Sequence, residues 1–185
     1  MKDFYMKKYI LTGTPGSGKT TLLHALRRKG YAVVEEAATD VIAFEQSMGV
    51  STPWTDPLFI HKILHLQIHR EHQANTSSVS IQFFDRSPLC TYALCIFLGY
   101  TPPPELMIEI NRITTKEVFQ SNVFFIENLG SIDHTAARKI SFDDALLFEK
   151  IHKNVYQHFG YELIFIPCIK INERVQYIIN KIQFK

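Results

Sequence analysis

The stretch Gly13-Thr-Pro-Gly-Ser-Gly-Lys-Thr20 decides the fold of this chain. It matches the pattern G-x-x-x-x-G-K-[ST] in full, and it lies between an apolar run at 9–12 and a helical pattern at 19–29. In such a strand–loop–helix unit the backbone N–H groups of the loop form a concave nest for phosphate, and the helix N-terminus adds its dipole. The sequence therefore predicts a loop that binds the phosphates of a nucleotide.

The individual residues of this loop have separate predicted roles. Glycines allow the backbone to approach the phosphates and to take positive φ values. Lys19 is expected to reach the β- and γ-phosphates, and the hydroxyl of Thr20 is expected to ligate Mg²⁺. The expected cofactors are therefore ATP and Mg²⁺. The residues expected to bind the nucleotide are Gly13, Thr14, Pro15, Gly16, Ser17, Gly18, Lys19, Thr20 and Thr21.

Outside the loop, apolar runs alternate with amphipathic stretches. Strands are predicted at 9–12, 31–35, 79–85, 123–127 and 161–167. Helices are predicted at 19–29, 36–48, 56–73, 88–98, 104–119, 141–159 and 172–182. The stretch from Ser141 to Asp144 resembles a capping box that opens the helix at 141–159, and Asn172 is expected to cap the last helix. The strand runs are continuously apolar, which is typical of strands buried on both faces. Five such strands separated by helices predict an α/β fold with a parallel sheet covered by helices.

Length and composition restrict the class of protein. A chain of 185 residues with no linker or repeat predicts one domain. The balance of 20 Lys+Arg against 18 Asp+Glu argues against nucleic-acid binding by bulk charge. No apolar run approaches the ~20 residues that span a bilayer, and the N-terminus does not resemble a signal peptide. The three cysteines show no C-x-x-C, which indicates reduced, mostly buried thiols. We expect a cytoplasmic protein.

The predicted strand at 79–85 ends in Asp85, followed by Arg86. An apolar strand ending in Asp is a Walker B arrangement, which can place a carboxylate on the Mg²⁺ shell. ATPases that activate water commonly carry Glu after this Asp, whereas an Arg suits a bidentate grip on phosphate. The alternative is an Asp at a helix start beside a surface Arg. The chain lacks the N-K-x-D motif of small GTPases and has too few residues for the helical subdomain of a ring ATPase.

Two further segments are candidates for the same site. Glu35 and Glu36 end the strand at 31–35, on the edge where ligands of open α/β sheets bind. A carboxylate there can accept a proton from a substrate hydroxyl, and only one of two adjacent residues should face the cleft. The segment 128–140 has no clear pattern; it contains Arg138 and is a candidate lid over the γ-phosphate. The alternatives are a pair of helix N-terminal acids and an ordinary exposed loop.

Other patterns are weaker. The spacing of four histidines on the helix at 56–73 allows a zinc site, but an amphipathic helix with polar histidines is favoured; they are His61, His65, His69 and His72. The same region is a candidate lining of an acceptor pocket, through Trp54, Phe59, His61 and Gln67. The basic clusters at 7–8 and 27–29 are expected to be solvated.

Taken together, these motifs resemble the P-loop kinase-like ATPases of the AAA_28 type, a group related to the ribosylnicotinamide kinase domain and to nucleoside and nucleotide kinases. The matching stretches are GTPGSGKTTL at 13–22, VVEEAA at 33–38, WTDPLF at 54–59, FFDRSP at 83–88, ARKISFDDA at 137–145, GYELIFIP at 160–167 and INERVQYI at 171–178. The resemblance implies a three-layer α/β/α sandwich with a five-stranded parallel sheet of order 2-3-1-4-5.

The resemblance also assigns residues. It singles out Glu36 of the glutamate pair, marks Asp85 and Arg86 as the D-R of the third strand, and makes Arg138 the lid arginine. One departure concerns substrate: members of the group often carry an Arg shortly after E-A-A, where this chain has 38–40 as Ala-Thr-Asp.

The leading hypothesis is a Mg²⁺- and ATP-dependent kinase acting on a nucleoside- or nucleotide-like small molecule. In this hypothesis Lys19 and Arg138 hold the γ-phosphate, and Glu36 activates an acceptor hydroxyl. Arg86 positions a phosphate or the acceptor, and the metal ligands are Thr20 and Asp85. Two alternatives stay open: an NTPase whose nucleotide state regulates a partner, and a nucleotide-binding protein without turnover. The fold alone accommodates all three.

Overall fold

The computed structural model describes residues 6–13, 16–76, 79–127 and 141–183. Its centre is a parallel sheet of five strands in the order β2-β3-β1-β4-β5, which confirms the sheet order implied by the resemblance. The strands are β1 (Lys7–Gly13), β2 (Ala32–Val34), β3 (Ile81–Asp85), β4 (Asn122–Ile126) and β5 (Glu162–Ile166). Strand β1 pairs with β3 on one side and with β4 on the other, so the strand that leads into the phosphate loop is the central one.

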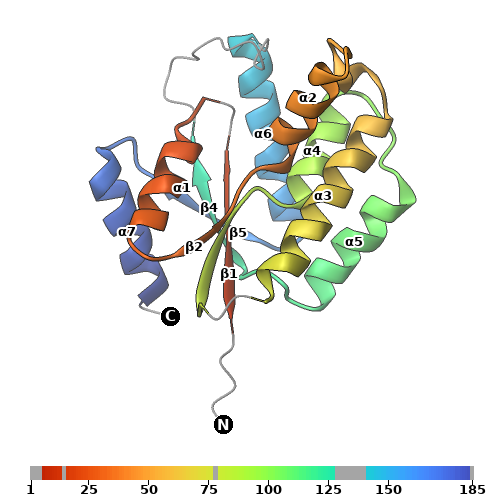
Figure 1. Cartoon of the computed structure of the whole chain (residues 1–185). Helices are drawn as coiled ribbons and strands as arrows, with labels where there is room; N and C mark the ends of the chain where they lie inside the picture. Colours follow the sequence, from red (N-terminus) through yellow and green to blue (C-terminus); the bar gives the residue numbers. More distant parts are fainter. Residues whose placement is uncertain (1–5, 14–15, 77–78, 128–140, 184–185) are drawn as a thin grey trace.

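Helices cover both faces of the sheet (Figure 1). One face carries α1 (Lys19–Arg28) and α7 (Ile171–Gln183). The other helices are α2 (Ala37–Ser47), the 3₁₀ turn η1 (Pro53–Thr55), α3 (Leu58–Ala74), α4 (Pro88–Phe97), α5 (Pro104–Thr115) and α6 (Phe142–His158). The result is the expected three-layer α/β/α sandwich. None of the described helices is long and apolar enough to cross a membrane.

Successive side chains of the central strands point to opposite faces of the sheet, and they fill a hydrophobic core on each face. On β1, Ile10 packs with residues of α3 to α6, whereas its neighbour Leu11 packs with residues of α1 and α7. Burial on both faces is thereby confirmed for β1, β3 and β4. The prediction is wrong for the two edge strands: the residues of β2 are only half-buried, and in β5 the side chain of Phe165 is 41% exposed. Strand β5 pairs with β4 alone, so it lies at an edge of the sheet where the helical layers cover less of it.

Most helix ends lie within two residues of their predicted positions, and two local predictions are wrong. Helix α5 stops at Thr115 rather than 119, because Glu117 takes a positive φ of 48° and Phe119 turns into the core against Phe84. Asn172 does not cap α7, which begins at Ile171. The capping box of α6 is confirmed: the Oγ atom of Ser141 accepts from the N–H of Asp144 at 3.1 Å.

Two expectations about polar residues need correction. Lys8 is not solvated: only 6% of it is exposed, and its ammonium forms an ion pair with Glu71 of α3 and donates to the Oδ1 atom of Asn75 at 2.6 Å. The reason is that β1 is central, so a side chain at its start points into the layer beneath α3.

Of the three free cysteines, Cys90 and Cys95 are buried as expected, but Cys168 is exposed.

Candidate active site

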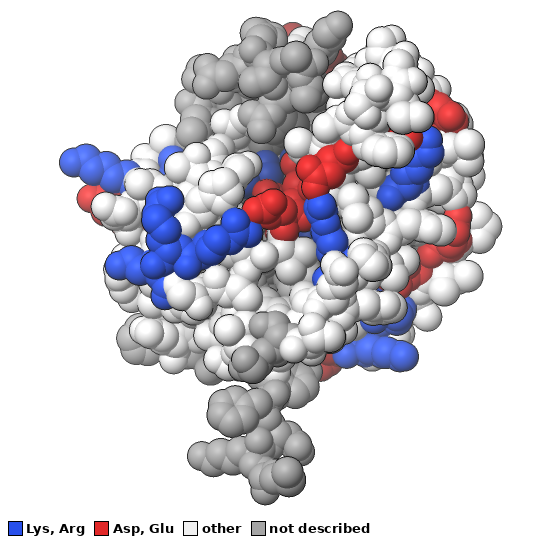
Figure 2. Space-filling model, viewed as in Figure 1, with Lys and Arg blue, Asp and Glu red and all other residues white. Residues whose placement is uncertain are grey.

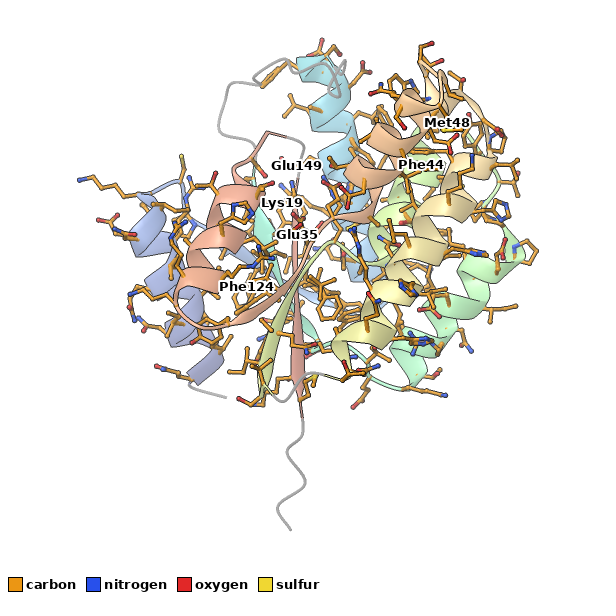
Figure 3. The ribbon with its side chains drawn as sticks, viewed as in Figure 1. Lys19, Glu35, Phe44, Met48, Phe124 and Glu149 are labelled. Atoms are coloured by element: carbon orange, nitrogen blue, oxygen red, sulfur yellow. The ribbon has the colours of Figure 1, made fainter. Side chains whose placement is uncertain are left out.

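The predicted site lies at the carboxyl edge of the sheet. Strands β2, β3 and β1 are neighbours in that order, so the residues that follow them meet at one edge. Figure 3 shows Lys19 of α1 and Glu35 at the end of β2 at this edge. The charges of three other predicted residues, Glu36, Asp85 and Arg86, act on the ammonium of Lys19. The structure therefore brings four of the five predicted catalytic residues together; Arg138, the fifth, lies outside the described residues.

The phosphate loop has the backbone expected of it. Gly13, Gly16 and Gly18 have φ values of 134°, 84° and 84°, all in the region that favours glycine. At Gly13 a Cβ atom would lie 2.0 Å from the carbonyl oxygen of Ile126, so β4 approaches too closely for any other residue. Helix α1 begins at Lys19, directly after the loop. Thr14 and Pro15 lie outside the described residues.

Lys19 is buried and folds back over the loop. Its Nζ atom donates to the carbonyl of Gly13 at 3.0 Å and to the Oγ atom of Ser17 at 3.4 Å. Burial and the positive charge of Arg86 lower the pKa of Lys19 to about 7, although Asp85 and other groups oppose the shift. An anion bound in the loop would stabilise the charged form of this ammonium. Phosphate binding and the protonated, positively charged form of Lys19 would therefore favour each other.

Asp85 provides an oxygen ligand at the same edge. It is 6% exposed, and its Oδ1 atom has no hydrogen-bond partner in the part of the chain that the structure describes. Burial and the charge of Glu36 raise the pKa of Asp85 to about 6, against the effect of Lys19. A buried carboxylate oxygen without a partner is a ligand that Mg²⁺ favours, and Thr20 adds a hydroxyl from the first turn of α1. The residues present thus fit a magnesium ion.

Arg86 and Glu36 form an ion pair at the end of β2 and β3. The Nε atom of Arg86 lies 2.5 Å from the Oε1 atom of Glu36, and only 9% of the Arg86 side chain is exposed. The alternative of a surface arginine is therefore wrong. Burial raises the pKa of Glu36, but Arg86 and Lys19 outweigh it and hold that pKa below its usual range. Glu36 is consequently ionised at neutral pH.

The two glutamates point in different directions, as the strand pattern predicts. Glu35 turns toward α1, where it accepts from the Nη2 atom of Arg27 at 2.8 Å. Glu36 turns toward Arg86 and also accepts from the hydroxyl of Thr39 at 3.0 Å. The Glu36 side chain is 22% exposed, compared with 52% for Glu35. Glu36 is therefore the member of the pair that the geometry places beside Lys19 and Asp85.

A cation from α3 clamps the turn that carries these glutamates. The Nη1 atom of Arg70 donates to the carbonyl of Glu35 at 2.9 Å and to that of Glu36 at 2.8 Å, and its Nη2 atom pairs with Asp40. The turn before E-A-A is thus held by an arginine from another helix. No sequence signal marked Arg70, because its position depends on how α3 packs beside β2.

A pocket opens between α3 and the ends of β2 and β3. It is lined by Val34, Glu35, Gln67, Arg70, Glu71, Phe84, Asp85, Arg86, Ser87, Pro88, Glu109 and Phe119. Figure 2 shows acidic side chains gathered near the centre of this face, with basic side chains on either side. The Oε1 atom of Gln67 accepts from the hydroxyl of Thr91 at 2.8 Å, which fixes the orientation of its amide. Gln67 therefore lines the pocket with its orientation already set.

The other acceptor candidates lie elsewhere. Phe59 is buried in a small core with Ala37 of α2, and Trp54 packs against that core. His61 forms an ion pair with Glu105 at the start of α5, and His65 approaches the same carboxylate at 3.5 Å. Among the described residues no group of three or more His, Cys, Asp or Glu side chains could hold a metal ion.

His152 of α6 also contacts the site, and nothing in the sequence indicated this contact. This side chain is fully buried, and its Nε2 atom accepts from the Nη1 atom of Arg86 at 3.3 Å. A histidine among apolar residues of an amphipathic helix is usually a packing residue, so its spacing carried no sign of this contact. The long separation along the chain, 66 residues, makes the contact a product of tertiary structure.

The fold and the site define the class of protein: a phosphate-binding loop, a carboxylate at the end of β3 and the sheet order 2-3-1-4-5 are those of a P-loop phosphotransferase or ATPase. More particularly, the chain belongs to the AAA_28 family, described as AAA domain, whose sequence model matches residues 8–174. No curated protein matches the chain.

Solved structures of deoxyadenosine kinase from M. mycoides share the fold. The one with bound dATP has a TM-score of 0.63 and 16% identity, and the match covers 96% of this chain and 99% of that one. The one with dCMP and dCDP has a TM-score of 0.62 and 16% identity, covering 96% and 100%. The one with dCTP has a TM-score of 0.56 and 17% identity, covering 97% and 100%. At these identities the likeness shows the fold alone.

Proposed function

We propose that this protein is a Mg²⁺-dependent kinase that transfers the γ-phosphate of ATP to a hydroxyl group of a nucleoside-like acceptor. The observation that carries the proposal is the Glu36–Arg86 pair, placed beside Lys19, with Arg86 lining the pocket under α3. Phosphoryl transfer needs positioning and charge stabilisation more than covalent chemistry, and these residues supply both.

A hydroxyl acceptor fits this pocket better than a phosphorylated one. The two arginines that line it are already engaged, Arg70 with Asp40 and two carbonyls, and Arg86 with Glu36. The carboxylates of Glu35 and Asp85 add negative charge at the same edge. An acceptor phosphate would be repelled by these carboxylates and would have to share both arginines with their present partners. An ionised Glu36 suits the remaining task, which is to accept a hydrogen bond and then the proton of an attacking hydroxyl.

The donor side of the proposal uses the phosphate loop. Lys19 would contact the β- and γ-phosphates, and Thr20 and Asp85 would hold Mg²⁺, which when bound neutralises charge on those phosphates. Arg138 would supply a further cation over the γ-phosphate, as the resemblance implies. Arg86, in the place where water-activating ATPases commonly carry Glu, favours transfer over hydrolysis.

The solved structures with the same fold suggest which acceptors to test first. They are structures of a deoxyadenosine kinase with bound dATP, with bound dCTP, and with dCMP and dCDP. Deoxyadenosine and deoxycytidine are therefore the leading acceptors in a panel that also includes ribonucleosides, nucleoside monophosphates and vitamin-derived nucleosides.

The test is a transfer assay with γ-labelled ATP, Mg²⁺ and this panel. We expect label on a nucleoside hydroxyl, and we expect Glu36→Gln to reduce transfer about 100-fold. Glu162→Gln, which changes an exposed carboxylate at the opposite end of the sheet, should leave transfer unchanged. Phosphate release that persists in Glu36→Gln, with no panel member labelled, would overturn the proposal in favour of an ATPase that signals its nucleotide state to a partner.

A further inference from the structure

His152 occupies an unusual position for a polar side chain. It lies in α6 with none of its surface exposed, and its ring packs edge-on against Phe148 with the ring centres 4.2 Å apart. Burial of a polar group without partners is costly, so both ring nitrogens need hydrogen bonds. The structure provides one for each nitrogen.

These two hydrogen bonds determine the tautomer. The Nδ1 atom lies 2.9 Å from the carbonyl oxygen of Phe148, and a carbonyl can only accept, so Nδ1 carries the proton. The Nε2 atom lies 3.3 Å from the Nη1 atom of Arg86, and a guanidinium can only donate, so Nε2 is the acceptor. Burial and the charge of Arg86 lower the pKa of His152 to about 3, which agrees with a neutral ring.

Arg86 has an unusual backbone conformation, and its position depends on contacts with neighbouring residues. Its φ of 72° is in the left-handed region, which is uncommon for a long side chain and marks strain at functional sites. Its backbone N–H donates to the carbonyl of Leu11 at 2.9 Å, which ties the residue to β1. Its Nε atom faces Glu36 and its Nη1 atom faces His152. No hydrogen bond joins the Nη2 atom to a described residue, and Arg86 lines the pocket under α3.

We propose that His152 is a positioning residue, whose Nε2 atom holds the guanidinium of Arg86 so that Nε serves Glu36 and Nη2 is presented to the acceptor pocket. The inference rests on the proposed function, because it assigns the held arginine to acceptor binding. It also connects α6 with the site, although α6 contributes no residue to the lining of the pocket.

A second contact keeps α6 in register with this edge of the sheet. Lys153, the next residue, pairs with Glu127 at 3.0 Å, just beyond β4, and its ammonium lies 5.3 Å from the ring centre of Phe125. The helix is thus anchored to β4 by one residue while the preceding residue reaches Arg86. A rigid support of this kind is what an orienting hydrogen bond requires.

The test uses three variants of His152. His152→Phe keeps the ring volume and removes the acceptor, His152→Asn keeps an amide too short to reach Arg86, and His152→Gln places an amide oxygen near the position of Nε2. Val155→Ala, another buried change in α6 without contact to Arg86, is the control for general loosening of the helix. The first readout needs no substrate: the ¹⁵N resonance of Arg86 Nε–H in the protein without nucleotide.

We expect a sharp Arg86 Nε–H signal in the wild type, in Val155→Ala and in His152→Gln, and a broadened one in His152→Phe and His152→Asn. With deoxyadenosine as acceptor probe, the latter two variants should lose about 10- to 100-fold in kcat/KM for the acceptor while KM for ATP stays within about 2-fold. His152→Gln should recover most of this loss. Should no panel nucleoside be phosphorylated, the proposed function fails, but the resonance still tests the positioning.

The proposal is overturned if the Arg86 signal is the same in His152→Phe as in the wild type. It is equally overturned if Val155→Ala broadens that signal as much, or if His152→Gln behaves like His152→Phe. If His152→Phe does not fold, the comparison of His152→Asn with His152→Gln decides in the same way.

Discussion

The Nε atom of Arg86 lies 2.5 Å from the Oε1 atom of Glu36, although the two residues follow different strands. Strands β2 and β3 are neighbours, with Val34 opposite Phe84, so the residues that follow them emerge together at the carboxyl edge. The pair is largely removed from solvent, and each charge depends on the other. The contribution of this pair to folding stability can be tested separately from its role in phosphoryl transfer.

Removal of one member should be worse than removal of both. Glu36→Gln leaves the buried charge of Arg86 without its carboxylate, and we expect a loss of about 1–3 kcal/mol in the free energy of unfolding, measured with urea. The double variant Glu36→Gln with Arg86→Met should be closer to the wild type in stability. Glu35→Gln is the matched control, since its pair with Arg27 is exposed and should contribute at most about 1 kcal/mol. Equal losses in Glu36→Gln and Glu35→Gln would contradict the buried pair.

Gly13 should tolerate no side chain. A Cβ atom there would meet the carbonyl oxygen of Ile126 at 2.0 Å, in addition to the cost of a positive φ. We expect Gly13→Ala to lower the free energy of unfolding by more than about 3 kcal/mol or to prevent folding. Gly30→Ala is the control: its φ is also positive, at 91°, but nothing lies within 4 Å of the added atom. It should lose only about 1–2 kcal/mol. Similar losses for both would show that β4 yields to the new atom.

The buried network around Lys8 should behave as a unit. Lys8→Met removes the ammonium that pairs with Glu71, whose carboxylate is only 7% exposed. Because Arg112 still pairs with Glu71 at 3.0 Å, we expect a loss of about 3 kcal/mol in thermal or urea unfolding. The double variant Lys8→Met with Glu71→Met should lose less than the sum of the single changes. Additive losses would mean that the two charges do not interact. Lys62→Met, in the more exposed pair with Glu45, should cost under about 1 kcal/mol.

His152 should make stability depend on pH in weak acid. Its folded-state pKa, lowered to about 3, lies below the unfolded value of about 6.5, so the folded chain binds fewer protons. The free energy of unfolding should therefore fall as pH drops from about 6.5 toward 3, by at most about 1.4 kcal/mol per pH unit. The charged groups that face His152 are Arg86, Lys19 and Glu36. We expect the pKa shifts of these three groups to persist when His152 is replaced by Phe.

Urea unfolding between about pH 6.5 and 4.5 measures this dependence. His152→Phe should flatten the decline relative to the wild type, because the variant has no imidazole to protonate on unfolding. The control is His69→Gln, a change at an exposed histidine of α3, which should leave the decline intact. Parallel declines in the wild type and in His152→Phe would show that the ring is not held neutral.

Several parts of the site could be predicted because their signals are local. The phosphate loop is a contiguous pattern whose glycines are required by backbone conformation, and the structure confirms positive φ at Gly13, Gly16 and Gly18. Glu35 and Glu36 diverge, as expected for adjacent residues, although they follow β2 instead of ending it, and the cap of α6 follows from Ser141 and Asp144. The sheet order followed from resemblance to a family and not from periodicity.

Other parts of the site depend on how the layers meet. Arg70 reaches the turn after β2 from α3, and His152 reaches Arg86 from α6, at sequence separations of 34 to 66 residues. Lys8 looked like a solvated basic end, but the central place of β1 in the sheet buries it against Glu71. In each case the residue type is visible in the sequence and its partner is not.

The sequence by itself therefore determined the elements, the phosphate loop and the identity of the charged groups at the carboxyl edge, since these depend on backbone propensity and on side-chain periodicity within a few residues. Only the tertiary structure decided which charges neutralise one another: Glu36 with Arg86, Lys8 with Glu71, and Arg70 with the turn that carries Glu36. The physical reason is that Coulomb energies and hydrogen bonds depend on distances of a few ångströms and on burial, and both are set by the packing of helices onto the sheet.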